Sequence, residues 1–265
     1  MTRFVAILCY YTGIDRLFYW LNRRAKRIIT FHNVLPDELF LRTTANGVSS
    51  RLSDFRFIIR ELKRRWRFSV DLFDAKTVTI TFDAGYRNQY EVAAKVLDEE
   101  GGIPAIVFIA GDVRSGEALV IDRVLHWVSH VPQEVRENLG YATAGELWGK
   151  RLWREFSADG ATKAQALFER LNALYPYAKV LDSLDAEYRR LRLSGITENE
   201  TDDLRRRGWL VGWHTKSHYP LSRLASAEKR AEIAPPTAEL AAAPFSFPVR
   251  RTAERRCRVG GNRLK

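Results

Sequence analysis

The chain has few cysteines and no long apolar run, and both absences exclude classes of protein. Cys9 and Cys257 are its only cysteines and lie near opposite ends of the 265 residues, which excludes a disulfide framework and a thiolate metal site. Asp15 and Arg16 interrupt the apolar stretch near the N-terminus, so that stretch is too short to span a membrane. We therefore expect a protein of the cytoplasm, with one sizeable hydrophobic core.

Basic residues follow this apolar stretch, at Arg23, Arg24, Lys26 and Arg27. An apolar helix with a basic flank is compatible with peripheral association at the inner face of a membrane, and a helix that packs on the domain is the alternative. We interpret residues 1–26 as an N-terminal helical segment.

The formal net charge of +11 is unevenly distributed. Residues 250–265 contain seven basic side chains against Glu254 alone, so this tail holds +6 of the total. A basic tail without a recognised nucleic-acid-binding module does not indicate nucleic-acid binding. We expect no nucleic-acid partner, and we treat residues 250–265 as a separate tail.

Short apolar segments alternate with amphipathic ones through the first half of the chain. Residues 27–34, 78–82 and 105–110 have the composition of buried strands, and residues 88–100 have helical spacing. A strand, a helix and a strand in this order predict a right-handed crossover and a parallel sheet. In such a sheet, functional groups gather at the carboxyl ends of the strands.

The pattern changes after the third strand. Residues 121–195 have helical periodicity without clear strands, and we interpret them as a helical insertion. The strand pattern resumes at residues 209–213 and ends with a short strand at 245–247.

Four polar residues follow predicted strands. His214 and His218 are four residues apart, a spacing that can place two imidazoles on one side as metal ligands; two partly exposed histidines are the alternative. Asp83 can act as a base or can cap a turn. His32 can be a ligand or a hydrogen-bond donor, or a buried histidine bonded to backbone.

Other histidines and aromatic residues are weaker candidates. His126 and His130 are also four apart, and we expect them on the surface of a helix in the insertion. Aromatic residues near the predicted rim can either stack on sugar rings or belong to the core: Tyr86, Trp209, Trp213 and Tyr219.

The segments TFDAGY at residues 81–86 and HTKSH at residues 214–218 resemble motifs of the polysaccharide deacetylases, the NodB-homology family of carbohydrate esterases. The resemblance covers residues 27–249 apart from the insertion. It implies a distorted (β/α) barrel that removes acetyl groups from an acetylated polysaccharide or oligosaccharide with a divalent metal, usually zinc. It also implies that Asp83 is the catalytic base and that His214 and His218 are metal ligands.

The chain departs from the family pattern in three places. Ala84 stands where the family has an aspartate ligand, so we expect weak metal binding. Ser246 stands where the family has an arginine that orients the base. The later family motifs have no match, so we expect a barrel that is incomplete at its C-terminal end. A catalytically inactive homologue that binds a glycan, or that serves in an assembly, is the alternative to an enzyme.

Overall fold

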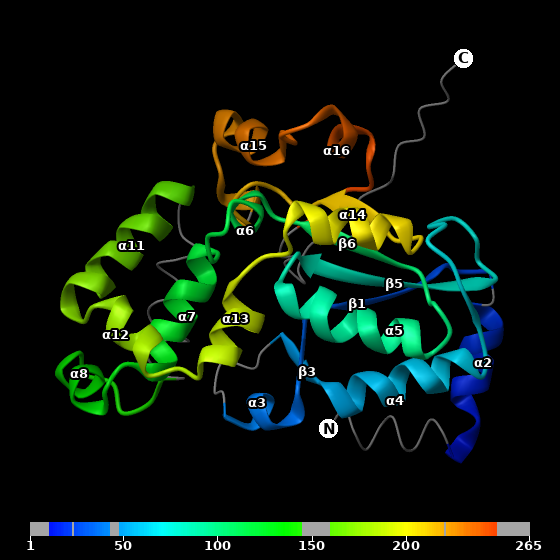
Figure 1. Ribbon diagram of the computed structural model, residues 1–265, viewed down its shortest axis with the longest axis horizontal. Helices are drawn as coiled ribbons and strands as arrows, with labels where there is room; N and C mark the ends of the chain where they lie inside the picture. Colours follow the sequence, from blue (N-terminus) through cyan, green and yellow to red (C-terminus); the bar gives the residue numbers. More distant parts are fainter. Residues whose placement is uncertain (1–10, 23, 43–47, 145–159, 220, 248–265) are drawn as a thin grey trace.

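The computed structural model describes residues 11–22, 24–42, 48–144, 160–219 and 221–247. It is a mixed α/β protein with a parallel sheet and helices packed against it (Figure 1). The predicted basic tail at 250–265 lies outside these residues, as do residues 1–10 and 23 of the predicted N-terminal segment.

The main sheet has five parallel strands, with the order β1-β5-β6-β7 and with β4 also paired to β5. These strands are β1 (Arg27–Phe31), β4 (Arg67–Phe68), β5 (Thr77–Ala84), β6 (Ala105–Ile109) and β7 (Leu210–Trp213). A second parallel pair contains β2 (Asn33–Leu35) and β3 (Ser49–Arg51). The predicted strands at 78–82, 105–110 and 209–213 and the parallel sheet are thus confirmed. The predicted strand at 27–34 is divided between β1 and β2, and residues 245–247 form a single bridge instead of a strand.

The sheet is open in the part of the chain that the structure describes. Beyond β7, Phe245 adds one isolated parallel bridge to Trp213. The closed barrel that the resemblance implies therefore stays a prediction.

Helices cover the apolar face of the sheet. Figure 1 shows α4, α5 and α14 beside the strands, with α15 and α16 near the carboxyl ends of the strands. The helical elements outside the predicted insertion are α2 (Ile14–Leu21), α3 (Asp37–Arg42), α4 (Leu52–Lys63), η1 (Gln89–Ala94), α5 (Lys95–Glu99), α6 (Gly111–Arg114), α14 (Glu198–Arg206), η3 (Leu221–Arg223), α15 (Ser226–Ile233) and α16 (Ala238–Ala242).

Strand β5 has one apolar face and one polar face. Because side chains alternate along a strand, Val78, Ile80 and Phe82 point into the helix-covered core, and Thr79 and Thr81 point the other way. The two threonines are also buried, where Thr79 donates to the Ser69 carbonyl at 2.6 Å and Thr81 donates to Thr30 at 2.9 Å. This alternation determines the face on which Asp83 emerges.

The regular elements described between β6 and β7 are helices. They include α7 (Val120–His130), α8 (Gln133–Asn138), α11 (Gly160–Leu174), α12 (Tyr177–Asp182) and α13 (Ala186–Leu193), followed by α14. A separate apolar cluster holds α7, α11 and α12 together, with Val124, Trp127 and Leu167 at its centre. The helical character of the insertion is confirmed, and its limits as a domain stay a prediction.

The expectation for His126 is wrong. His126 is completely buried in α7, and its Nε2 lies 2.8 Å from the Tyr188 hydroxyl. Its Nδ1 lies 2.7 Å from the Asp122 carbonyl oxygen. Tertiary contacts from α13 cover this face of α7, and the local sequence gave no sign of them.

Replacing Phe82 with alanine is expected to lower the free energy of unfolding by about 3–5 kcal/mol. Phe82 is fully buried, and its ring stacks on Trp209 with centroids 5.5 Å apart. Denaturant unfolding of Phe82→Ala measures the loss. Phe73→Ala is the control, because Phe73 is 93% exposed and its loss should change stability little. Equal stabilities of the two variants would contradict this view of the core.

Candidate functional site

Asp83 emerges from the polar face of β5, close to the end of the strand. Its side chain is 11% exposed, and its Oδ1 accepts a hydrogen bond of 3.4 Å from the Ser246 hydroxyl. Its Oδ2 lies 3.7 Å from His32 Nε2. The structure therefore brings together Asp83, His32 and Ser246.

His214 follows β7 and is completely buried. Its Nδ1 lies 3.0 Å from the Ser246 carbonyl oxygen. Because a carbonyl can only accept, Nδ1 carries the proton and Nε2 presents a lone pair. Nε2 is buried and has no hydrogen-bond partner. Ser246 thus contacts His214 through its backbone and Asp83 through its hydroxyl.

His218 lies beside His214, with ring centroids 4.8 Å apart. Its Nδ1 is also buried and without a hydrogen-bond partner. The predicted convergence of these two imidazoles is therefore present in the structure. Their role as metal ligands stays a prediction.

Unusual backbone conformations are concentrated at this site. Among the described residues, the non-glycine positions with positive φ are Ala84 (80°), Thr215 (68°) and His218 (60°). Each costs about 1–2 kcal/mol relative to ordinary backbone, so surrounding contacts must hold it in place. Such strain is typical of functional sites.

Two neighbouring elements hold the histidine loop. From α6, the Gly111 N–H donates to the Thr215 carbonyl at 3.0 Å. From α15, Glu232 accepts from the Ser217 N–H at 2.9 Å through Oε2, and from the Lys216 N–H at 2.9 Å through its carbonyl. These bonds fix the loop, and they compensate for the strain in it.

Burial sets the protonation of the site. It raises the pKa of Asp83 to about 6, although the hydrogen bond from Ser246 acts in the opposite direction. Burial lowers the pKa of His214 well below its usual range and lowers the pKa of His218 to about 4. At neutral pH, Asp83 is therefore mainly ionised and both imidazoles are neutral.

The residues present fit a divalent metal only in part. Two neutral imidazole nitrogens are suitable ligands for zinc. Ala84 is buried in an apolar cluster with Tyr86, Ala110, Val113 and Leu119 and offers no ligand. Among the described residues, no group of three histidine, cysteine or acidic side chains is placed to hold a metal ion. The donor set is therefore incomplete.

The aromatic residues near the rim belong to the core. Tyr86, Trp209, Trp213 and Tyr219 are at most 5% exposed. They are therefore not available as stacking platforms for sugar rings.

A buried ion pair that was not predicted from the sequence lies beside the site. Arg192 Nη2 donates to Asp122 Oδ1 at 2.7 Å, and the two side chains are 1% and 4% exposed. The Tyr86 hydroxyl donates to the other Asp122 oxygen. Arg192 appeared in the sequence only as one of several basic residues on a helix.

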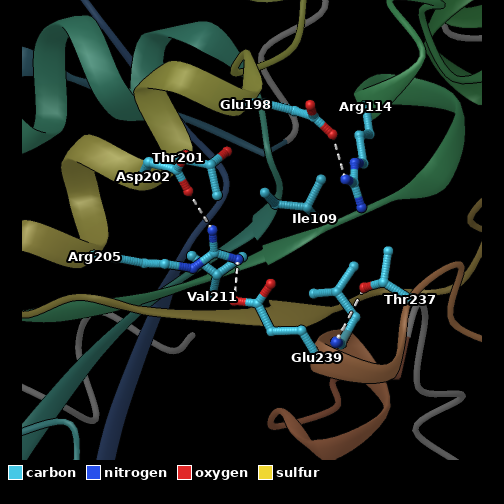
Figure 2. A pocket seen from close by; sticks show the side chains of 10 residues that line it. Ile109, Arg114, Glu198, Thr201, Asp202, Arg205, Val211, Thr237 and Glu239 are labelled. Atoms are coloured by element: carbon cyan, nitrogen blue, oxygen red, sulfur yellow. Dashed lines mark hydrogen bonds and ion pairs between the residues drawn. The ribbon is translucent and has the colours of Figure 1, made fainter.

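A cavity of about 230 Å³ lies on the opposite face of the sheet from Asp83, lined by Ile109 and Val211 and by side chains of α14 and α16 (Figure 2). Its arginines are paired: Arg114 with Glu198, and Arg205 with Asp202 and Glu239. It contains none of the predicted site residues, so we place the candidate site at Asp83.

Comparisons with known proteins return matches only among solved structures. No protein family and no curated protein matches the chain. The Streptococcus pyogenes deacetylase PplD, solved in complex with acetate, matches 78% of this chain and 64% of its own, with 12% identity and a TM-score of 0.42. IcaB from Ammonifex degensii matches 84% of this chain and 73% of its own, with 15% identity and a TM-score of 0.43.

Both structures match with a TM-score below 0.5, so the resemblance to polysaccharide deacetylases rests on the segments at residues 81–86 and 214–218 of this chain. This chain spans less than two thirds of PplD. At these identities the matches say nothing about individual residues, so the roles proposed below rest on the geometry of this chain.

The contribution of Asp83 to the stability of the protein is expected to fall as pH rises from 4 to 6. The Asp83 pKa is about 6 in the folded protein and about 3.9 in an unfolded chain, so the folded state binds this proton more tightly. The resulting stabilisation, of the order of 3 kcal/mol, is complete below the unfolded pKa and is lost as pH rises through the folded value.

Urea unfolding of the wild type and of Asp83→Asn at several pH values measures this effect. The amide does not titrate, so the difference in stability between the two proteins should change with pH between 4 and 6. Glu134→Gln, at an exposed position, is the control and should follow the wild type. A constant difference between the wild type and Asp83→Asn would show that the Asp83 pKa is not raised.

Proposed function

We propose that this protein is a polysaccharide deacetylase-like hydrolase that removes acetyl groups from a glycan. One observation carries the proposal: a buried carboxyl group with a raised pKa is joined through Ser246 to a histidine whose other ring nitrogen is unpartnered. A carboxylate with a pKa near 6 is suited to act as a general base close to neutral pH.

In this proposal Asp83 takes a proton from the water that attacks the acetyl carbonyl. The Ser246 hydroxyl holds the carboxylate, and the Ser246 carbonyl holds His214 with Nε2 unprotonated. Deprotonated Asp83 is the active form, so hydrolysis should increase as pH rises through about 6.

We further propose that His214 and His218 bind zinc weakly. Their unpartnered nitrogens supply two ligands, and the side chain of Ala84 has no atom that could be the third. Because this donor set is incomplete, the proposed role of Asp83 does not depend on a bound metal.

The buried Ala84 favours a second candidate function. A protein that lacks one metal-ligating residue can keep its glycan-binding surface and act as an inactive binding or assembly protein. The burial of Tyr86, Trp209, Trp213 and Tyr219 removes the predicted stacking platforms, which reduces the support for this candidate.

We propose a cytoplasmic location with peripheral association at the membrane. None of the described helices has the length and apolar character needed to cross a bilayer. Helix α2 exposes Ile14, Leu17 and Leu21, which are between 40% and 59% exposed, and this apolar surface supports association with a membrane surface.

Acetate release from N-acetylated and O-acetylated oligosaccharides, measured with added zinc, tests the proposed hydrolase. Asp83→Asn should lower the rate by about 100-fold or more, because the base is lost. Ala84→Asp should raise the rate, because it adds an anionic ligand and because aspartate tolerates positive φ better than alanine.

Glu134→Gln is the control and should match the wild type. Release by Asp83→Asn at the wild-type rate would contradict the role of Asp83. If neither the wild type nor Ala84→Asp releases acetate and the wild type binds the oligosaccharide, the binding protein is the correct alternative.

A further inference from the structure

The helical insertion returns to the candidate site immediately after α13. Residues 194–196 run antiparallel to the turn that follows Asp83, with a bridge between Tyr86 and Gly195. Three hydrogen bonds of 2.9 Å join the two segments: Ile196 N to Gly85 O, Arg87 N to Ser194 O, and Asn88 Nδ2 to Leu191 O. Arg192 therefore stands at a fixed position beside the carboxyl end of β5.

Arg192 places a buried positive charge at this position. Its guanidinium carbon lies 4.6 Å from the centre of the Tyr86 ring, and Tyr86 is two residues beyond Ala84. Burial lowers the pKa of His32, the charge of Arg192 lowers it further, and Asp122 acts in the opposite direction. His32 lies 3.7 Å from Asp83. The charge of Arg192 thus acts on His32, one residue of the candidate site.

The hydrogen-bonding capacity of Arg192 is only partly used. Nη2 is bonded to Asp122, whereas Nε and Nη1 are buried and have no hydrogen-bond partner. An unpaired buried donor is costly, and one on a charged group is more so. An anionic oxygen would satisfy these donors better than any other partner.

We infer that Arg192 is an anion-binding residue of the candidate site, whose unpaired Nε and Nη1 bind the oxygen of a carboxylate. The Arg192 guanidinium would then supply a positive charge at a site where the set of metal ligands is incomplete. The inference rests on the proposed function in one respect: hydrolysis of an acetyl group yields acetate, which is therefore the carboxylate we select as a probe.

Titration with sodium acetate, followed by protein-observed NMR at constant ionic strength with a chelator present, tests the inference. The wild type should bind acetate, and it should bind acetamide, the neutral analogue, about tenfold more weakly or worse. The chelator removes any contribution of a metal. Binding is read separately from hydrolysis, so the inference can hold even if no acetate release is found.

Two variants identify the residue. Removing Arg192 alone would leave Asp122 as an unpaired buried charge, so the double variant Asp122→Asn/Arg192→Met removes both charges together. This variant should lose acetate binding. Arg192→Lys keeps the charge but loses the guanidinium donors, and it should bind acetate about tenfold more weakly. If the double variant does not fold, the acetate affinity of Arg192→Lys alone tests the role of the guanidinium group.

Arg190→Ala is the matched control, because Arg190 lies on the same helix, is largely exposed and pairs with Glu91. It should bind acetate like the wild type. The inference is overturned if the wild type does not bind acetate, or if it binds acetamide as tightly as acetate. It is also overturned if every folded variant of Arg192 binds acetate as tightly as the wild type does.

Discussion

The parallel pairing of β5 with β1 on one side and β6 on the other is the constraint on which the rest of this structure depends. It buries all eight residues of β5, so the alternation of side chains determines their environment. The apolar side chains enter the helix-covered core, and Asp83 emerges on the polar face. Because β1, β5 and β7 are parallel, their carboxyl ends lie at one rim, where Asp83 stands near the end of β5 and where His32 and His214 follow β1 and β7.

A second constraint ties the helical insertion to this rim. The chain leaves β6, forms a group of helices with its own apolar cluster, and returns to pair with the turn after Asp83. The return brings the Asp122–Arg192 ion pair against Tyr86. A buried pair of this kind contributes little net stability, because desolvation offsets the attraction between the charges. Its position beside the site is the feature that points to a functional role.

The sequence predicted the sheet well because each strand carries a local signal. Residues 78–82 and 105–110 are short, apolar and rich in β-branched side chains, and the structure has strands at both places. Asp83, His214 and His218 were found because they follow such strands. His126 was misplaced, and Arg192 was missed, because their burial depends on contacts 62 and 70 residues away along the chain. Ser246 was interpreted only as a departure, although it contacts both Asp83 and His214.

Calorimetric titration with zinc tests most directly the central claim, that His214 and His218 form a metal site that lacks one ligand. The wild type should bind one zinc ion weakly, and His214→Ala should abolish this binding, because it removes one of only two nitrogen ligands. His130→Ala, which changes a histidine of the insertion, should bind zinc like the wild type. Zinc binding that survives in His214→Ala, or a folded wild type that binds no zinc, would contradict the claim.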